Sequence, residues 1–258
     1  MDYITHKIPL LINGIFFVIF KMVGEYMKYN RILLKLSGEA LKNDKDGIID
    51  FEYVLKLCSE IKKIRDLGIE IAIVVGGGNI WRGRNNTYIN SDVSDKIGIL
   101  STTINSFIID EAFKKLKTNS IVLNSLEIER IISKVSEEEL KTLIKNNILI
   151  FGGGTGEVGF STDTAAAIYA KEMDADVIIK LTNVDGVYDK DPKISEDAKL
   201  YKNISYQEVL DKNIKVMDKT SIEISMKNQI PIIVTNIKTL NKLDEFLCGK
   251  LEGSLISL

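Results

Sequence analysis

The stretch RILLKLSGEA, residues Arg31–Ala40, decides how the rest of the chain is interpreted. Its apolar run predicts a buried strand, and Lys35 lies near the end of that strand. A buried cation needs an anionic partner, because an unpaired charge away from water is costly. Gly38 allows a sharp turn that presents backbone N–H groups beside the lysine. Strand, lysine and glycine together indicate a phosphate site, and a lysine that extends from the strand end into solvent is the alternative.

Two more predicted strands run directly into glycine clusters. Glu70–Val75 is followed by Gly76–Gly78, and Ile148–Phe151 is followed by Gly152–Gly154. Consecutive glycines cost chain entropy unless the backbone must approach something closely, and a ligand is the expected reason. Ligands of open parallel sheets bind at the carboxyl ends of the strands. We therefore expect both clusters to share one edge of a sheet with Lys35.

Strands and helices alternate from residue 30 to the end of the chain, without a linker or repeat. A helix over Phe51–Leu67, with Asp50 as its cap, separates the first two strands and implies a right-handed crossover in a parallel sheet. A longer helix is expected over Asp95–Leu116, with apolar residues on its inward face. That face comprises Ile97, Leu100, Ile104, Phe107 and Ile108. The pattern predicts one α/β domain over residues 27–258.

The other predicted elements complete this alternation. Strands are expected over Ser120–Asn124, Asp176–Thr182, Pro231–Asn236 and Ser254–Ser257. Helices are expected over Ser136–Lys145, Thr164–Met173, Ser205–Asp211, Asp218–Asn228 and Thr239–Leu247. Thr162 or Asp163 is expected to cap the second of these helices, and Ser205 with Glu208 has the spacing of a capping box.

The composition excludes several classes of partner. The chain has 258 residues, 34 Lys+Arg and 36 Asp+Glu, so its net charge of −2 gives no broad basic field for nucleic acid or acidic membranes. Cys58 and Cys248 lie far apart in helical patterns, which is typical of packing residues in a reduced compartment. A cytoplasmic location is therefore expected.

The first 26 residues differ from the rest. Their apolar run, Ile8–Phe20, is too short to span a bilayer, and no clear small-x-small cleavage site follows it. We interpret residues 1–26 as a non-native extension or a mis-assigned start, with a targeting or anchoring segment as the alternative. The domain is expected to begin at Met27.

Phosphoryl transfer needs backbone and cationic groups around the phosphoryl oxygens. The chain offers two glycine-rich loops at strand ends, a lysine at a strand end and an arginine. Arg82 follows the first glycine cluster and can fork onto phosphate, although a surface arginine is the alternative. The chain has neither the Walker G-x-x-x-x-G-K-[ST] pattern nor a dinucleotide fingerprint. His6 is the only histidine, which disfavours histidine base catalysis and favours an acceptor already ionised near neutral pH, such as a nucleotide phosphate with a second pKa of about 6.

Five motifs together resemble the bacterial-type uridylate kinases of the amino acid kinase family. They are RILLKLSGEAL, VVGGGNIWRG, GGGTG with a downstream TD, KLTNVDGVYDKDP and KVMD, and the resemblance covers about Tyr29–Leu258. It implies a three-layer αβα sandwich with a mainly parallel sheet and ATP-dependent phosphorylation of UMP to UDP with Mg²⁺. It also implies a homohexamer, often controlled by GTP.

The resemblance also assigns residues to the two substrates, and no side chain is assigned to a metal. On the ATP side it implies Lys35, Leu36, Ser37, Gly38, Gly78, Arg82, Thr182, Tyr188 and Asp191, with Lys180 as a further candidate. On the UMP side it implies Gly77, Asp95, Thr155, Gly156, Glu157, Val158, Gly159, Phe160, Ser161 and Thr162. It implies catalytic roles for Lys35, Arg82 and Asp218. Asp218 would orient Lys35, and a helix cap is the alternative role for this aspartate.

Two departures from the family pattern fall on the UMP side. The usual Asn-Pro-aromatic-aromatic-Thr-Thr-Asp run is replaced by Glu157–Asp163, with Gly159 in place of an aromatic residue. The usual arginine before the uridylate aspartate is absent, and Ser91 and Asp92 stand in that region. Two other functions therefore stay open: another small-molecule kinase of the family, and a nucleotide-binding regulatory or storage protein without turnover.

Overall fold

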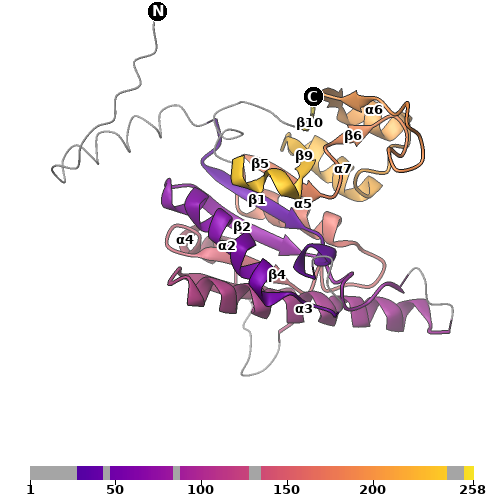
Figure 1. Cartoon of the computed structure of the whole chain (residues 1–258). Coiled ribbons are helices and arrows are strands. Elements are labelled where there is room, and N and C mark those ends of the chain that lie inside the picture. The colour runs from indigo at the N-terminus through magenta and orange to yellow at the C-terminus, as the bar shows by residue number, and fades with distance from the viewer. Residues whose placement is uncertain (1–27, 43–46, 84–87, 128–134, 243–252) are drawn as a thin grey trace, which may run out of the picture.

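A mainly parallel sheet forms the centre of the fold (Figure 1). The computed structural model describes residues 28–42, 47–83, 88–127, 135–242 and 253–258, and within these the sheet has eight strands in the order β3-β4-β2-β1-β5-β9-β10-β8. The strands are β1 (Arg31–Leu36), β2 (Glu70–Val75), β3 (Ser120–Asn124), β4 (Ile148–Gly152), β5 (Val177–Thr182), β8 (Asn203–Ser205), β9 (Ile232–Asn236) and β10 (Ser254–Ser257). All neighbours are parallel except β9 and β10. The expected N-terminal extension and Cys248 lie outside the described residues.

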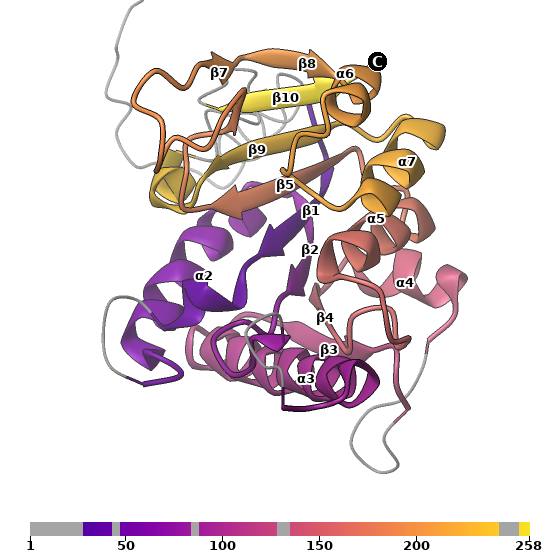
Figure 2. The same cartoon turned by 90° about the vertical axis from the view of Figure 1, so that its right-hand side faces the viewer.

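Helices cover both faces of this sheet, as Figure 2 shows. One face carries α2 (Phe51–Asp66), α3 (Ser91–Lys115) and the 3-10 helix η3 (Ile237–Lys242). The other carries α4 (Glu137–Leu143), α5 (Thr162–Glu172), α6 (Tyr206–Asp211) and α7 (Lys219–Lys227). A short pair, β6 (Val187–Tyr188) and β7 (Leu200–Tyr201), lies outside the main sheet. The predicted αβα sandwich is confirmed.

Helix α2 forms as its sequence predicts. The Asp50 side chain accepts a hydrogen bond from Tyr53 N, which caps the first turn. Its apolar face, which includes Val54, Ile61 and Cys58, is buried against the sheet. Burial raises the pKa of the Cys58 thiol to about 12, so this cysteine is a packing residue, as expected.

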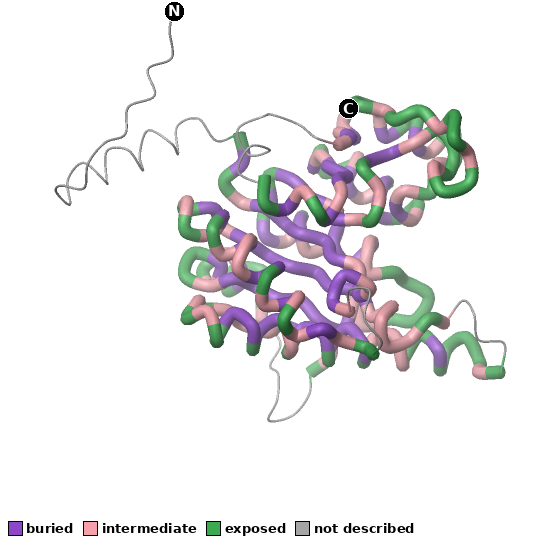
Figure 3. Tube along the Cα trace, in the orientation of Figure 1, coloured by how far each residue is buried: buried purple, intermediate pink, exposed green. Residues whose placement is uncertain are grey.

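Helix α3 contradicts the prediction of its inward face. Leu100 and Ile104 are each 51% exposed and Phe107 is 38% exposed. The middle of the buried face instead carries small polar residues, while the C-terminal part is apolar and the predicted Ile108 does pack partly buried against the core. The polar residues are Ser101, Thr102, Thr103, Asn105 and Ser106. Their hydrogen bonds to the glycine loops and to the helix's own carbonyls satisfy them away from water, so the apolar stripe faces outward. Figure 3 shows that burial is concentrated in the strands of the central sheet.

Several helix boundaries also differ from those expected. Helix α3 begins at Ser91, four residues early, because Asn90 caps it. Helix α5 is capped by the Ser161 hydroxyl, which accepts from Asp163 N and Thr164 N, so neither expected cap is used. The Ser205–Glu208 capping box is confirmed. No helix within the described residues is long and apolar enough to cross a membrane.

Candidate active site

Two lysines meet one aspartate at the carboxyl ends of the central strands. Lys35 on β1 is the register partner of Lys180 on β5, so both side chains project from the same face of the sheet, near its carboxyl edge. Lys35 Nζ lies 2.6 Å from Asp163 Oδ1, and Lys180 Nζ lies 2.8 Å from Asp163 Oδ2. Lys180 Nζ also donates to the Val216 carbonyl at 2.6 Å. The three side chains form a cluster with one excess positive charge, and we call it the Lys-Asp-Lys centre.

The charge balance of this centre follows from its burial. Burial on its own raises the pKa of Asp163, but the ammonium groups of Lys35 and Lys180 outweigh that effect and hold the pKa at about 2. Burial lowers the pKa of Lys180, and the attraction of Asp163 opposes that change. Asp163 is therefore an anion at neutral pH. The excess cation is suited to phosphate oxygens that enter from solvent.

Asp163, and not Asp218, is the partner of Lys35. Asp218 caps α7 by accepting from Ser221 N, and it also accepts from the hydroxyls of Ser161 and Thr164. The expectation that Asp218 orients Lys35 is therefore replaced by orientation through Asp163. Sequence reasoning missed Asp163 as a functional residue, because it weighed this aspartate only as a helix cap. The signal was present: an aspartate follows a glycine loop at the start of a helix.

The glycine loops approach one another, and this explains part of their composition. A Cβ at Gly38 would lie 2.7 Å from both Gly76 O and Gly78 N, so the loop after β1 packs backbone to backbone on the loop after β2. A Cβ at Gly77 would lie 2.8 Å from the Ser101 side chain of α3. Close approach was the expected reason for these glycines. The structure shows that the glycine loops already approach neighbouring protein atoms this closely, in addition to any ligand.

The polar face of α3 holds both glycine loops in place. Asn105 Nδ2 donates to Gly76 O at 2.7 Å, at the end of β2. Thr102 Oγ1 accepts from Gly153 N at 2.8 Å, at the end of β4. One helix thus fixes the two glycine loops that follow β2 and β4, which lie on the β1 side of the Lys-Asp-Lys centre. This fixation is the structural reason for the buried hydroxyl and amide groups on α3.

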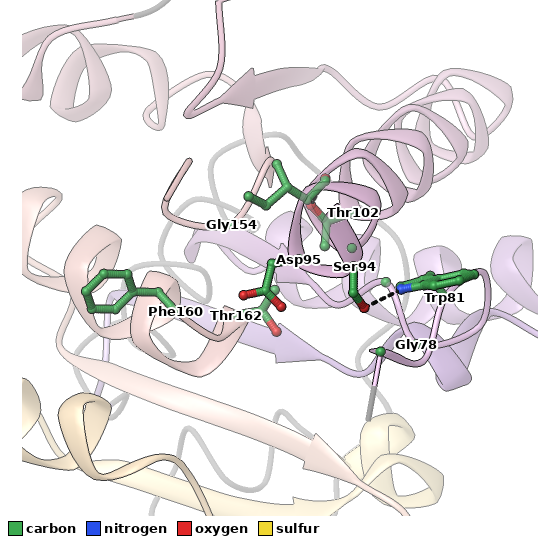
Figure 4. Close-up of a pocket in the computed structure, with 12 residues that line it drawn as sticks. Gly78, Trp81, Ser94, Asp95, Thr102, Gly154, Phe160 and Thr162 are labelled. Carbon is green, nitrogen blue, oxygen red and sulfur yellow. Dashed lines mark hydrogen bonds between the residues drawn. The ribbon is translucent and has the colours of Figure 1, made fainter. Parts of the chain in front are cut away.

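A small cavity of about 160 Å³ lies between α3, the loop after β2 and the loop that precedes α5 (Figure 4). Of the residues assigned to UMP, Gly77, Asp95, Phe160 and Thr162 line it. Asp95 is the fifth residue of α3, and its Oδ2 accepts from Gly159 N at 2.7 Å. Trp81, which was not predicted, also lines the cavity and donates its indole N–H to Ser94 Oγ at 2.9 Å.

The remaining residues assigned to UMP belong to the same loop without lining this cavity. They are Thr155, Gly156, Glu157, Val158, Gly159 and the helix cap Ser161. The cavity is smaller than the roughly 300 Å³ at which ordinary ligand pockets begin.

A larger cavity of about 570 Å³ lies on the other side of the centre, and Lys180 lines it. Three residues assigned to ATP, Thr182, Tyr188 and Asp191, line it as well. Four lysines around this cavity were not predicted as site residues, although two of them lie in the KLTNVDGVYDKDP and KVMD motifs. They are Lys190, Lys193, Lys212 and Lys215.

Arg82 and the phosphate-loop residues complete the site. Arg82 Nη2 lies 2.8 Å from Glu39 Oε1, and its side chain is 58% exposed. Leu36 is buried in β1, while Ser37 lies between β1 and Gly38. No group of three His, Cys, Asp or Glu side chains that would hold a metal ion occurs within the described part of the chain. Magnesium commonly binds through substrate phosphates and few side chains, which fits this donor set.

Comparisons with known proteins match this architecture. A family model described as the amino acid kinase family matches residues 30–236. The solved UMP kinase from Ureaplasma parvum is 36% identical, with a TM-score of 0.83 over 90% of this chain and 100% of that chain. UMP kinase from Bacillus anthracis is 32% identical, with a TM-score of 0.85 over 89% and 96%. Uridylate kinase from Archaeoglobus fulgidus is 25% identical, with a TM-score of 0.65 over 88% and 99%.

Proposed function

This chain belongs to the amino acid kinase family, and we propose that it transfers the γ-phosphoryl group of ATP to UMP, with UDP and ADP as products. One observation carries the proposal: two separate cavities are lined by a residue of the Lys-Asp-Lys centre or by its neighbour in the chain. Lys180 lines the larger cavity, and Thr162, next to Asp163 in α5, lines the smaller one. A centre with excess positive charge between a donor and an acceptor is the arrangement that phosphoryl transfer needs.

The donor side of the reaction is assigned to the larger cavity. ATP would place its adenosine among Thr182, Tyr188 and Asp191, with its phosphates directed toward Lys180 and Lys35. Backbone N–H groups at Ser37 and Gly38 supply further donors to the phosphate oxygens. Magnesium, when bound, neutralises phosphate charge, and the substrate phosphates would supply most of its ligands. The four further lysines that line this cavity also favour a polyanionic ligand such as ATP.

The transfer step needs positioning and charge stabilisation from the protein. An oxygen of the UMP phosphate attacks the γ-phosphorus of ATP, the bond to the β-phosphate oxygen breaks, and ADP leaves with the bonding electron pair. The acceptor phosphate, with a second pKa of about 6, is ionised at neutral pH and needs no protein base. Lys35 and Lys180 stabilise the charge on the transferring oxygens, and Asp163 holds both lysines in position.

The acceptor is assigned to the smaller cavity. Asp95 would accept hydrogen bonds from the ribose hydroxyls, while Gly77, Gly78 and Arg82 face the phosphates in transfer. Phe160 and Thr162 would close the cavity over the nucleotide. Asp218 acts indirectly, because it bonds to Ser161 and Thr164 at the start of α5, the helix that carries Asp163.

The assembly is proposed to be a homohexamer, as the resemblance implies. Val93, Leu100, Ile104 and Phe107 form an exposed apolar stripe along α3 at spacings of seven, four and three residues, which suits pairing with a second copy of the chain. Sedimentation of the protein and of an Ile104→Glu variant tests this surface. A variant with the mass of the wild-type assembly would exclude α3 from the contact between copies.

Two further properties belong to this proposal. We propose control by GTP, which is tested by adding GTP to the assay at subsaturating ATP. A cytoplasmic location is proposed as well, and the free, buried thiol of Cys58 supports a reducing compartment.

An acceptor screen tests the activity itself. Purified protein with Mg-ATP is given UMP, CMP, other nucleoside monophosphates and small carboxylates, and ADP release is measured. We expect UMP to be the best acceptor. If UMP is not phosphorylated at about millimolar concentration while another acceptor is, the chain is a different small-molecule kinase of the family. If no acceptor reacts although ATP binds, a regulatory or storage role replaces the catalytic one.

A further inference from the structure

Glu39 is an acidic residue inside a phosphate site, and neither substrate explains its presence. It lies in the 3-10 helix η1 (Gly38–Leu41), which follows closely after β1, the strand that carries Lys35. A carboxylate here repels phosphate unless a cation neutralises it. Arg82 supplies that cation: Glu39 Oε1 lies 2.8 Å from Arg82 Nη2 and 3.1 Å from Arg82 Nε. The other oxygen, Oε2, lies 3.9 Å from Lys42 Nζ.

The contacts hold one edge of the guanidinium and leave the other edge out of the pairing. Arg82 Nε also donates to the Gly78 carbonyl at 3.3 Å. Nε and Nη2 are therefore held by the protein, while Nη1 is not used in the pairing with Glu39. A guanidinium has five N–H donors in a planar fork, so fixing one edge sets the direction of the opposite edge.

The position of Glu39 ties together the two loops that must meet at the transferring phosphates. Glu39 belongs to the segment after β1, and Arg82 belongs to the segment after β2. A Cβ at Gly78 would lie 3.8 Å from Glu39 Oε1, so the carboxylate lies over the glycine loop. The pair therefore spans the contact between the two loops.

We propose that Glu39 is a positioning residue: it fixes the Arg82 guanidinium so that the Nη1 edge faces the phosphates in transfer. This inference rests on the proposed phosphoryl-transfer function. The Arg82 side chain is mostly exposed, so the pair contributes little to stability. Its effect lies in the direction of the guanidinium, because small errors in position carry large kinetic costs.

A double-mutant cycle tests the inference in the full chain. Glu39→Gln is compared with wild type, and the same change is made in an Arg82→Lys background, which keeps the charge but removes the fork. We expect Glu39→Gln to lower kcat/KM about tenfold, mainly through kcat, which is below the roughly 100-fold cost of a 1 Å misplacement. In the Arg82→Lys background the same change should have less than about a twofold effect, since the held edge is gone.

The control is Glu60→Gln, which removes the same charge from an exposed pair with Lys63 on α2 and should leave kcat/KM unchanged. An equal loss from Glu39→Gln in both backgrounds would make Glu39 merely structural and overturn the inference. A gain in kcat/KM would overturn it as well, because Glu39 would then hold Arg82 away from the phosphates. If Glu39→Gln does not fold, Glu39→Asp, which shortens the reach and keeps the charge, takes its place.

A second measurement does not depend on turnover. The Arg82 Nε–H proton should exchange slowly with solvent in the ¹⁵N NMR spectrum of wild type and rapidly in Glu39→Gln. Addition of inorganic tripolyphosphate should shift the Arg82 resonance of wild type while its exchange stays slow. Equal exchange in the two proteins would overturn the inference even if UMP is not the acceptor, whereas a wild type that fails to phosphorylate UMP would overturn only the proposed acceptor.

Discussion

The two sides of the proposed transfer path differ in how the protein holds them. The Lys-Asp-Lys centre is held by ion pairs between side chains that are each less than 15% exposed. The loop over the smaller cavity is held to α3 by a hydrogen bond from Gly159 N to Asp95, and its Val158 and Phe160 are 39% and 49% exposed. Breaking a buried ion pair costs much free energy, because it leaves a charge unpaired away from water. An exposed contact costs little to break, because water replaces it. The chemistry is thus fixed rigidly, while acceptor recognition is easily altered.

The largest expected effect is a loss of kcat when the Lys-Asp-Lys centre is altered. Lys35→Ala should lower kcat about 100-fold or more, because the lost ammonium stabilises the transferring oxygens. The fold should persist, since Asp163 keeps Lys180 as its partner. Steady-state kinetics and a thermal melt measure the two effects separately.

The matched control for Lys35 is Lys62→Ala, which removes an exposed lysine that pairs with Asp66 on α2. Its kcat should equal that of wild type. A Lys35→Ala protein that melts like wild type and keeps near-normal activity would disprove the assignment of Lys35.

Low pH tests the Lys-Asp-Lys centre through its contribution to the free energy of unfolding. The folded-state pKa of Asp163 is about 2, below its ordinary value of 3.8, so ionised Asp163 stabilises the fold above about pH 4. That contribution should disappear as pH falls from about 4 to about 2, with a loss of roughly 2 kcal/mol in the free energy of unfolding. Urea unfolding at several pH values measures it. Asp163→Asn should lack this share of the pH dependence, and identical curves for both proteins would contradict the ion-pair network.

Replacing Asp95 tests how the smaller cavity binds the acceptor. Asp95→Ala should raise the KM for UMP about tenfold, because it removes a charged hydrogen-bond acceptor for the ribose. It also releases Gly159 N, which loosens the loop. The KM for ATP should stay unchanged, because Asp95 does not line the larger cavity. Equal changes in both KM values would show that Asp95 supports the whole site and not the acceptor alone.

The fold was predictable because its strands carry an unambiguous pattern. Continuous apolar runs that end in glycine, such as Glu70–Val75, have one solution in an α/β chain, and the structure confirms it. Helix α2 was also predictable, because its apolar residues recur at helical spacing and form the face that packs on the sheet. Membership of the amino acid kinase family, predicted from motifs, is also confirmed.

Helix α3 shows where periodicity fails. Its apolar spacing is genuine, but periodicity does not say which face turns inward. Thr102 and Asn105 decide that, because the glycine loops need hydrogen-bond partners that the rest of the sheet does not supply. Of the two roles left open for Asp218, orienting Lys35 or capping a helix, the structure shows the helix cap. A motif places residues near a site, but only the packing of α5 on the strand ends shows that Asp163 reaches both lysines.

The smallest expected effect concerns Gly159, where the family has an aromatic residue. A ring at this position should gain about 1 to 3 kcal/mol by stacking on the base. The backbone opposes that gain: Gly159 has a φ of +84°, and a side chain in this region costs about 1 to 2 kcal/mol. No atom lies within 4 Å of a Cβ built there, so the cost comes from the backbone and not from a clash.

Gly159→Phe should therefore lower the KM for UMP by only a few-fold, about 1 kcal/mol or less, and leave the KM for ATP unchanged. Gly159→Ala is the matched control, because it carries the backbone cost without the ring and should raise the KM for UMP about fivefold to tenfold. The ratio between the two variants isolates the contribution of the ring. If alanine and phenylalanine give the same KM, the residue at 159 does not meet the base, and the departures to test next are Glu157 and the arginine that is missing before Asp95.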